Sequence, residues 1–386
     1  MIPLAHTLLL LLLPLVKGLP EITTITTIAT TFTTLYQPQI PSPPLTPNDQ
    51  KTLPETLSRA LTTANLLLPR EGNDWYNATT GLWQDLWWNS GNIVTTLARL
   101  GQVIDEGEET EDWALAWIQV YDLTNDARYL TAAEGIFEEL TTGLNATCGG
   151  QWWDIAHTAS NTINNALYIS VAAHLANRVP TITTASSKDP ETYRAVARTY
   201  LHWLQDQNLL TPNGTYVDGL DLQTCQPTGP VFTYNQGVMI GALVEMSRFP
   251  SSSSASSASG DKEGEILLDQ AEALATGTLT SLLDSAGILT ETAFLLTHPN
   301  LDLVSAQFKG IFVRNLALLY SVRPREGYRD FLQRNARSIW ERDRIPEGKN
   351  EGLLGASWQG PGDASVSSAA QGSGLDCLVA AVGVGV

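Results

Sequence analysis

Apolar residues recur at helical spacing along most of this chain, and that periodicity constrains the fold more than any other feature. Trp113, Trp117 and Val120, for example, fall on one face of a helix. Clusters of Gly, Asn and Pro separate the periodic segments. We predict eleven helices, at residues 50–67, 87–103, 110–123, 128–142, 158–178, 188–206, 235–248, 262–284, 303–321, 328–343 and 365–382.

So many helices of moderate length, with few strand patterns, predict an all-α fold. Successive antiparallel helix pairs favour a closed ring of helical hairpins over an open bundle. The period of about 34 residues that marks a superhelical array is absent from the sequence. In residues 210–234 we expect a short β-hairpin.

The N-terminal 48 residues differ in composition from the rest. The apolar run Leu8–Val16 is shorter than the roughly 20 residues that a membrane span needs, and it predicts a signal peptide at residues 1–18. Residues 19–48 are rich in Thr and Pro, which predicts a disordered, O-glycosylated stalk. The folded domain is then 49–386, and the protein is secreted.

Other features agree with an extracellular location. Asn77, Asn145 and Asn213 each begin an N-glycosylation acceptor sequence in a predicted loop. The three cysteines are too few for a disulfide-built scaffold. Cys148 and Cys225, both in predicted loops, are the favoured disulfide pair, and three free thiols are the alternative.

The charge balance excludes several functions. Asp and Glu outnumber Lys and Arg by 40 to 22, a formal net charge of −18. A nucleic-acid-binding surface needs the opposite sign, and so does electrostatic docking on an anionic membrane. Metal-ligand, phosphate-loop and serine-hydrolase motifs are absent from the sequence, so we expect no metal and no cofactor. A surface rich in Thr, Asn, Gln and Ser suits a neutral ligand, and we expect a monomer.

Four clusters combine aromatic residues with amides or carboxylates at predicted helix starts. They lie at residues 83–90, 148–154, 232–237 and 307–312. Aromatic faces and polar hydrogen-bonding groups are the mixture that binds sugars, although core tryptophans beside helix caps would give the same pattern. Four such clusters favour one shared pocket.

These clusters resemble glycoside hydrolase family 76, the endo-acting α-1,6-mannanases of bacteria and fungi. The blocks Trp-Trp-Asn-Ser, Trp-Ala-Leu-Ala-Trp, Cys-Gly-Gly-Gln-Trp-Trp, Tyr-Asn-Gln-Gly and Gln-Phe-Lys-Gly occur in the family order between about Trp75 and Ala381. The chain is most similar to the secreted fungal members. The resemblance implies an (α/α)6 barrel, with one of its twelve helices missing here.

The resemblance also implies a retaining mechanism on two adjacent aspartates just before the Trp-Ala-Leu-Ala-Trp helix. Counting back from Trp113 places Glu108 and Glu109 at those positions, and the segment from Ser90 to Asp112 is shorter than in the family. A retaining glycosidase needs two carboxyl groups about 5–5.5 Å apart. Glu108 and Glu109 are therefore the predicted catalytic pair. A misjoined exon, a natural variant and a loss of catalysis each explain the departure.

Further positions match the family's sugar-binding blocks. They are Trp87, Trp88, Asn89, Asp218, Asp221, Tyr234, Asn235, Gln236, Phe308 and Lys309. The resulting hypothesis is a secreted endo-hydrolase of α-1,6-linked mannan or mannoprotein glycan. The alternatives are an inactive mannan-binding homologue and a cell-wall transglycosidase. A lipid anchor is disfavoured, because the apolar tail from Leu375 is predicted to be the last barrel helix.

Overall fold

The computed structural model describes residues 55–67, 75–105, 113–180, 189–250, 257–294, 301–361 and 366–385. The predicted signal peptide and stalk, residues 1–48, lie outside these ranges. Within them the chain forms eleven α-helices, one for each predicted segment. They are α3 (Glu55–Asn65), α4 (Trp87–Asp105), α5 (Trp113–Thr124), α6 (Ala127–Thr142), α7 (Thr162–Arg178), α8 (Pro190–Asp206), α9 (Thr233–Ser247), α10 (Ser257–Ser281), α11 (Phe308–Val322), α12 (Glu326–Ser338) and α13 (Ser368–Gly383).

Short strands lie in the loops between the helices. The predicted hairpin exists as β4 (Val217–Leu220) and β5 (Pro227–Val231), and β3 (Ser160–Asn161) pairs antiparallel with β4 as a third strand. Strands β1 (Tyr76–Asn77) and β2 (Leu82–Trp83) form a second small sheet before α4. The 3-10 turns Thr292–Phe294 and Ser305–Gln307 precede α11, and the π-helical turn Ile339–Asp343 ends α12.

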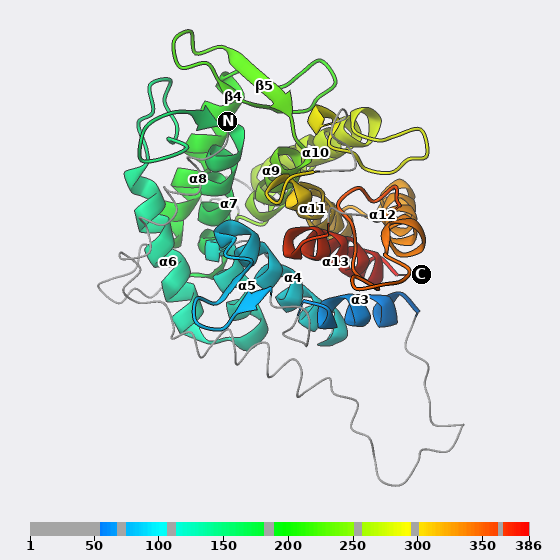
Figure 1. Cartoon of the computed structure of the whole chain (residues 1–386). Helices are drawn as coiled ribbons and strands as arrows, with labels where there is room; N and C mark the ends of the chain where they lie inside the picture. The colour runs from blue at the N-terminus through cyan, green and yellow to red at the C-terminus, as the bar shows by residue number, and fades with distance from the viewer. Residues whose placement is uncertain are drawn as a thin grey trace.

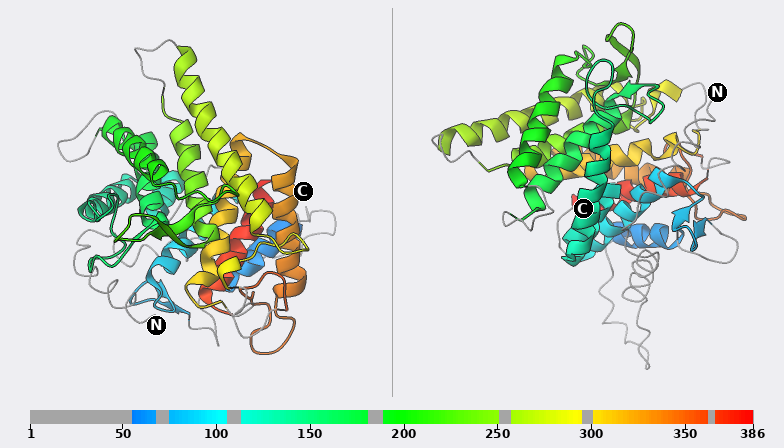
Figure 2. Two further views of the ribbon diagram at one scale, coloured as in Figure 1. Left: turned by 90° about the horizontal axis from the view of Figure 1, so that it is seen from above. Right: turned by 90° about the vertical axis from the view of Figure 1, so that its left-hand side faces the viewer.

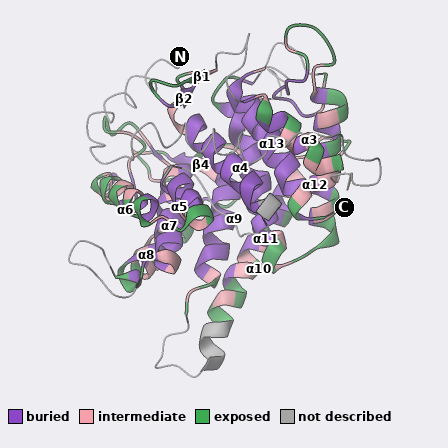
Figure 3. Cartoon of the chain, turned by 90° about the horizontal axis from the view of Figure 1, so that it is seen from below, coloured by how far each residue is buried: buried purple, intermediate pink, exposed green. Residues whose placement is uncertain are grey.

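The helices form two concentric layers (Figure 1). The inner helices α4, α5, α7, α9, α11 and α13 contact one another in that order, and α13 closes the ring on α4. Helices α3, α6, α8, α10 and α12 lie outside them. The inner layer is buried almost throughout, whereas the outer helices expose their outward faces (Figure 3). In α9, for instance, every residue from Thr233 to Met246 is buried. The longest described helix, α10, projects from the barrel (Figure 2).

All six inner helices run in the same direction. At one end of the barrel, a Cβ atom on Gly237 of α9 would lie 2.6 Å from the Cα of Phe312 in α11, so these helices touch near their starts. At the opposite end, Arg178 of α7 pairs with Glu245 of α9 near the ends of both helices. Parallel inner helices place their first turns together, and we call this the N-terminal end of the barrel.

The barrel lacks one outer helix among the described residues. Helices α4 and α5 are neighbours in the inner layer, and Gly101 of α4 lies against Leu123 of α5, near the end of each helix. They are therefore parallel. Only residues 106–112 connect them, outside the described ranges, and seven residues of helix would span about 10 Å. The described architecture is an (α/α)6 barrel with six inner and five outer helices, as predicted.

Most buried apolar side chains of the described residues belong to one large core, and a second, small cluster surrounds Leu86 and Leu301. The predicted last barrel helix is α13, whose residues from Ser368 to Ala381 are all buried. Among the described helices, none combines the length and the hydropathy that crossing a membrane requires.

Candidate functional site

The aromatic residues at the N-terminal end of the barrel form one connected cluster. Phe308, the first residue of α11, stacks on Tyr234 of α9 with the ring centroids 4.0 Å apart and the planes 4° apart. Trp88 in the first turn of α4 lies 6.1 Å from Phe308, and Phe232 lies 5.4 Å from it. Tyr234 and Phe308 are buried, whereas Trp88 and Phe232 are half-buried. The cluster therefore exposes aromatic surface contributed by two separate elements.

A carboxylate lies beside this cluster. Asp218 on β4 accepts a hydrogen bond from Asn161 Nδ2 over 2.8 Å and another from Asn235 Nδ2 over 3.4 Å. The hydroxyl of Tyr234 also hydrogen-bonds the carboxylate. Burial raises the pKa of Asp218, although these three donors act in the opposite direction. The carboxylate is thus held by three donors from two elements, β3 and α9, while its residue stays half-buried.

Two buried amide oxygens near the cluster have no hydrogen-bond partner. Asn89 donates Nδ2 to Gln307 Oε1 over 2.8 Å, which joins α4 to the turn before α11, but its Oδ1 accepts nothing. The Oδ1 of Asn235 is also without a donor. Buried polar atoms are normally satisfied in folded proteins. Both unsatisfied oxygens lie near the starts of inner helices, Asn89 in α4 and Asn235 in α9.

Two predicted contact residues have other roles in the structure. Gln236 is fully buried and uses its amide on the backbone, because it accepts from Tyr216 N over 2.7 Å and donates to the carbonyls of Tyr216 and Phe232. Asp221 is exposed in the turn after β4, where Gln223 and Thr224 donate to its carboxylate. Those bonds lower the pKa of Asp221. Gln236 fixes the strand against α9, and Asp221 shapes a turn.

Lys309 lies beneath the aromatic cluster rather than on its surface. It is fully buried, donates Nζ to the Ser357 carbonyl over 2.8 Å, and lies 4.7 Å from the centre of the Trp358 ring. Burial lowers the pKa of Lys309 to about 8, against the attraction of the Asp343 and Glu291 carboxylates. The ammonium group is therefore engaged inside the protein, by the Ser357 carbonyl and the Trp358 ring.

Two residues of the site were not among the predicted site residues. Asn161, the N-cap of α7, positions Asp218. Glu291 is completely buried and accepts hydrogen bonds from the backbone N–H and the hydroxyl of Thr233, the first residue of α9. Burial raises the pKa of Glu291 to about 7. A helix cap of the asparagine type could have marked Asn161, but nothing local marks Glu291.

The predicted catalytic pair, Glu108 and Glu109, lies outside the described residues. The structure does describe the helices before and after this segment, α4 and α5. Trp87 and Trp88 begin α4 at the N-terminal end of the barrel, and α5 runs parallel to α4 and begins at Trp113. Chain connectivity therefore places the two glutamates four and five residues before a helix whose first turn lies at the same end as the aromatic cluster.

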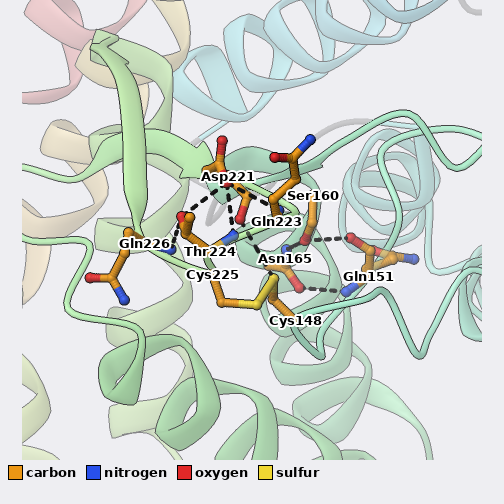
Figure 4. The surroundings of a disulfide bond; sticks show 9 residues. All are labelled: Cys148, Gln151, Ser160, Asn165, Asp221, Gln223, Thr224, Cys225 and Gln226. Atoms are coloured by element: carbon orange, nitrogen blue, oxygen red, sulfur yellow. Dashed lines mark hydrogen bonds between the residues drawn. A yellow bond between two sulfur atoms is a disulfide. The ribbon is translucent and has the colours of Figure 1, made fainter.

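A disulfide fastens the loops above the barrel. Cys148 and Cys225 are bonded with their Cα atoms 5.5 Å apart, and they join the loop after α6 to the β4–β5 hairpin (Figure 4). Cys377 is a buried free thiol in α13. The predicted glycosylation residues Asn77, Asn145 and Asn213 are all exposed. Among the described residues, no cluster of His, Cys, Asp and Glu could hold a metal ion.

Comparison with known protein families identifies the family of this barrel. The family model described as glycosyl hydrolase family 76 matches residues 70–381, which is most of the chain and all but the first of its described helices. The chain belongs to glycosyl hydrolase family 76. A search of curated protein sequences finds no match. Membership makes this domain a glycosidase-type barrel and confirms the resemblance of its sequence motifs.

Solved structures of family 76 share the fold. An inactive variant of a Salegentibacter α-1,6-mannanase, with two adjacent aspartates substituted and α-1,6-mannotetraose bound, is 20% identical, with a TM-score of 0.66 over 86% of this chain and 100% of that chain. A family 76 mannosidase from Bacteroides thetaiotaomicron is 16% identical, with a TM-score of 0.62 over 86% and 98%. Dfg5 from Chaetomium thermophilum, in complex with glucosamine, is 14% identical, with a TM-score of 0.57 over 95% and 92%. These likenesses establish the (α/α)6 barrel.

Proposed function

We propose that this protein is a secreted glycoside hydrolase that cleaves internal α-1,6-mannosidic linkages in unbranched mannan, with retention of configuration. The observation that carries the proposal is the joint position of Asp218 and the Trp88–Phe308–Tyr234 aromatic cluster at the N-terminal end of a family 76 barrel. Aromatic faces pack against the C–H faces of pyranose rings, while a fixed carboxylate and free amide oxygens accept hydrogen bonds from hydroxyls.

The linkage is proposed from the solved relatives. The Salegentibacter α-1,6-mannanase binds α-1,6-mannotetraose and α-1,6-mannotriose in its inactive variants. The same fold here, with aromatic rings beside a carboxylate, supports a substrate of that class. The overall negative charge, −18, is compatible with a mannan or a mannoprotein glycan, neither of which requires a basic surface.

Glu108 and Glu109 are the proposed nucleophile and acid/base. In a retaining glycosidase one carboxylate attacks the anomeric carbon while the other carboxyl group protonates the leaving oxygen, and water then reverses the sequence. Two neighbouring carboxyl groups raise each other's pKa, so one of them keeps its proton near working pH. Relatives with two adjacent aspartates substituted are inactive, which supports an adjacent pair as the reacting groups.

The test is release of reducing ends from linear α-1,6-mannan by the full chain, followed by Glu108→Gln and Glu109→Gln. We expect each substitution to reduce the rate by at least about a hundredfold, while Trp88→Ala raises KM. Full activity in both glutamine variants would contradict the catalytic assignment. Mannan binding without any hydrolysis would instead favour a non-catalytic mannan-binding homologue.

Secretion and cell-wall association are also part of the proposal. They rest on the apolar N-terminal run, the Thr/Pro-rich segment after it and three exposed acceptor asparagines. Expression in a eukaryotic host tests them. We expect the mature chain in the medium, without residues 1–18, and a mass that decreases on treatment with an N-glycan amidase. Retention inside the cell without glycan would contradict this assignment.

A further inference from the structure

An exposed tryptophan stands on the rim of the barrel, beyond the site described above. Trp153 follows the Gly-Gly-Gln-Trp motif and keeps 46% of its surface exposed. A large aromatic side chain that stays exposed loses the stabilisation that burial would give it. Exposure alone is common on protein surfaces, so a binding role for Trp153 rests on where its loop leads.

The loop that carries Trp153 is fixed by its own hydrogen bonds. Trp153 N donates to the Ala159 carbonyl over 2.8 Å, and Thr158 N donates to Asp154 Oδ1 over 2.9 Å. The ring of Trp152 stacks on that of His157 with centroids 4.5 Å apart and planes 10° apart. His157 adopts a left-handed backbone conformation, φ 57°, to allow the turn. The indole is thus presented by a rigid loop, which reduces the entropy lost on binding.

The same loop leads directly to the carboxylate of the site. Ala159, which accepts the hydrogen bond from Trp153 N, lies two residues before Asn161, the donor to Asp218. Two residues of extended chain span about 7 Å. Strand β3 continues from this loop into pairing with β4, so the backbone that carries Trp153 is connected through two residues to the partner of Asp218. We infer that a polymer bound at Asp218 extends toward Trp153.

The side chains next to Trp153 leave its indole and an aliphatic neighbour as the exposed contact surface. The nearby carboxylate, Asp154, is occupied by the N–H and the hydroxyl of Thr158. The adjacent exposed side chain, Ile155, is apolar and 61% exposed. We propose that Trp153 forms an outer subsite that stacks on a further mannosyl ring of the bound glycan. This inference rests on the proposed function. It adds a residue that affects how binding depends on glycan length and that takes no part in bond cleavage.

Calorimetric titration with α-1,6-mannobiose and α-1,6-mannotetraose tests the subsite. A Glu108→Gln, Glu109→Gln background keeps the ligands intact. We expect Trp153→Ala to weaken tetraose binding by about tenfold and to leave disaccharide binding within about twofold. Trp153→Phe, which keeps an aromatic ring, should restore most of the affinity. Leu210→Ala is the matched control, because Leu210 is similarly exposed, 52%, and should change neither ligand.

The outcomes separate this subsite from the proposed function. Unchanged tetraose binding in Trp153→Ala, with binding lost in Trp88→Ala, would overturn the subsite and leave the mannan-binding function intact. Equal losses for both ligands would also overturn an outer subsite, because the effect would not depend on chain length. Failure of the parent protein to bind either oligosaccharide would overturn the function itself, and the subsite with it.

Discussion

Asn161 Nδ2 donates a hydrogen bond to Asp218 Oδ2 over 2.8 Å, and this contact joins the cap of α7 to strand β4. The two residues are 57 positions apart in the sequence, yet together they set the direction of the carboxylate. A carboxylate held in this way can accept hydrogen bonds from a sugar without losing rotational freedom at the moment of binding.

Replacement of Asp218 by Asn should weaken catalysis. The amide keeps the shape but loses the charge and one acceptor. We therefore expect the activation free energy to rise by about 1.5–3 kcal/mol, which lowers kcat/KM on linear α-1,6-mannan roughly 10- to 150-fold. Initial-rate measurements give the value. Asp221→Asn is the matched control, since Asp221 lies exposed in a turn, and its rate should stay within about twofold. Equal effects of the two substitutions would contradict the role of Asp218.

Glu245 should be essential for stability at the opposite end of the barrel. It is fully buried, pairs with Arg178 over 3.0 Å and with Arg248 over 2.6 Å, and accepts from Asn177 over 2.8 Å. Burial alone would raise the pKa of Glu245, but the surrounding positive charges lower it to about 2. Its contribution is therefore present above about pH 4.5 and is lost as the pH falls toward 2.

Removal of this charge takes one carboxylate from Arg178, which keeps its pair with Asp122 over 2.9 Å, and one from Arg248, whose side chain is partly exposed. We expect Glu245→Gln to reduce the free energy of unfolding by about 1–3 kcal/mol at pH 7, measured by urea denaturation. Glu272→Gln is the control, because its partner Arg325 is exposed, and we expect a loss of less than about 1 kcal/mol. Similar losses in the two variants would show that burial of the pair does not determine its contribution.

Ionisation of Glu291 should make the folded protein less stable as the pH rises, which is opposite to the effect of Glu245. Its folded-state pKa is raised by burial from 4.5 to about 7, so the folded protein holds this proton more tightly than the unfolded chain. The stabilisation is complete below about pH 4.5 and disappears as the pH rises to about 7. Glu291→Gln should remove this slope from a series of urea midpoints between pH 4.5 and 7.5. An unchanged slope in the variant would mean that Glu291 does not titrate there.

Loss of the disulfide should affect both stability and ligand binding. It closes a loop of 77 residues, for which the chain-entropy model gives a stabilisation of about 4.5 kcal/mol. We expect Cys148→Ser with Cys225→Ser to lower the melting temperature and to weaken mannotetraose binding, because the bond ties the loop of Trp153 to the hairpin of Asp218. Cys377→Ala retains the disulfide and should bind normally. Normal binding in the double variant would show that the loops hold their positions without the bond.

The helices could be predicted from sequence because their signal is local. Apolar spacing and turn clusters gave all eleven segments, with ends that differ from the structure by a few residues. The segment predicted from 158, for example, begins at Thr162, because residues 160–161 pair with β4 instead. The helix predicted from 303 begins at Phe308, after a 3-10 turn. A local sequence pattern does not show that the first residues of a segment will pair with a distant strand and so stay outside the helix.

The individual roles at the site could not be predicted in the same way. Tyr234, Asn235 and Gln236 are consecutive in the sequence, and each carries a hydrogen-bonding group. In the structure Tyr234 stacks on Phe308, Asn235 binds Asp218, and Gln236 turns toward the backbone of Tyr216. Successive helix positions point about 100° apart, so the three side chains face different neighbours. Which of them faces the site depends on where the adjacent helices lie.

By itself, the sequence determined the helical elements, the order of the family motifs and the gathering of aromatic blocks at helix starts. The tertiary structure decided which of those starts meet. Asn89 and Gln307 are hydrogen-bonded across 218 positions, and Glu291 caps α9 from a loop 58 positions away. Periodicity reports only which face of a helix is apolar. Closure of the inner ring, with all six helices parallel, brings their first turns into one site, and burial there sets the pKa of Glu291 and of Lys309.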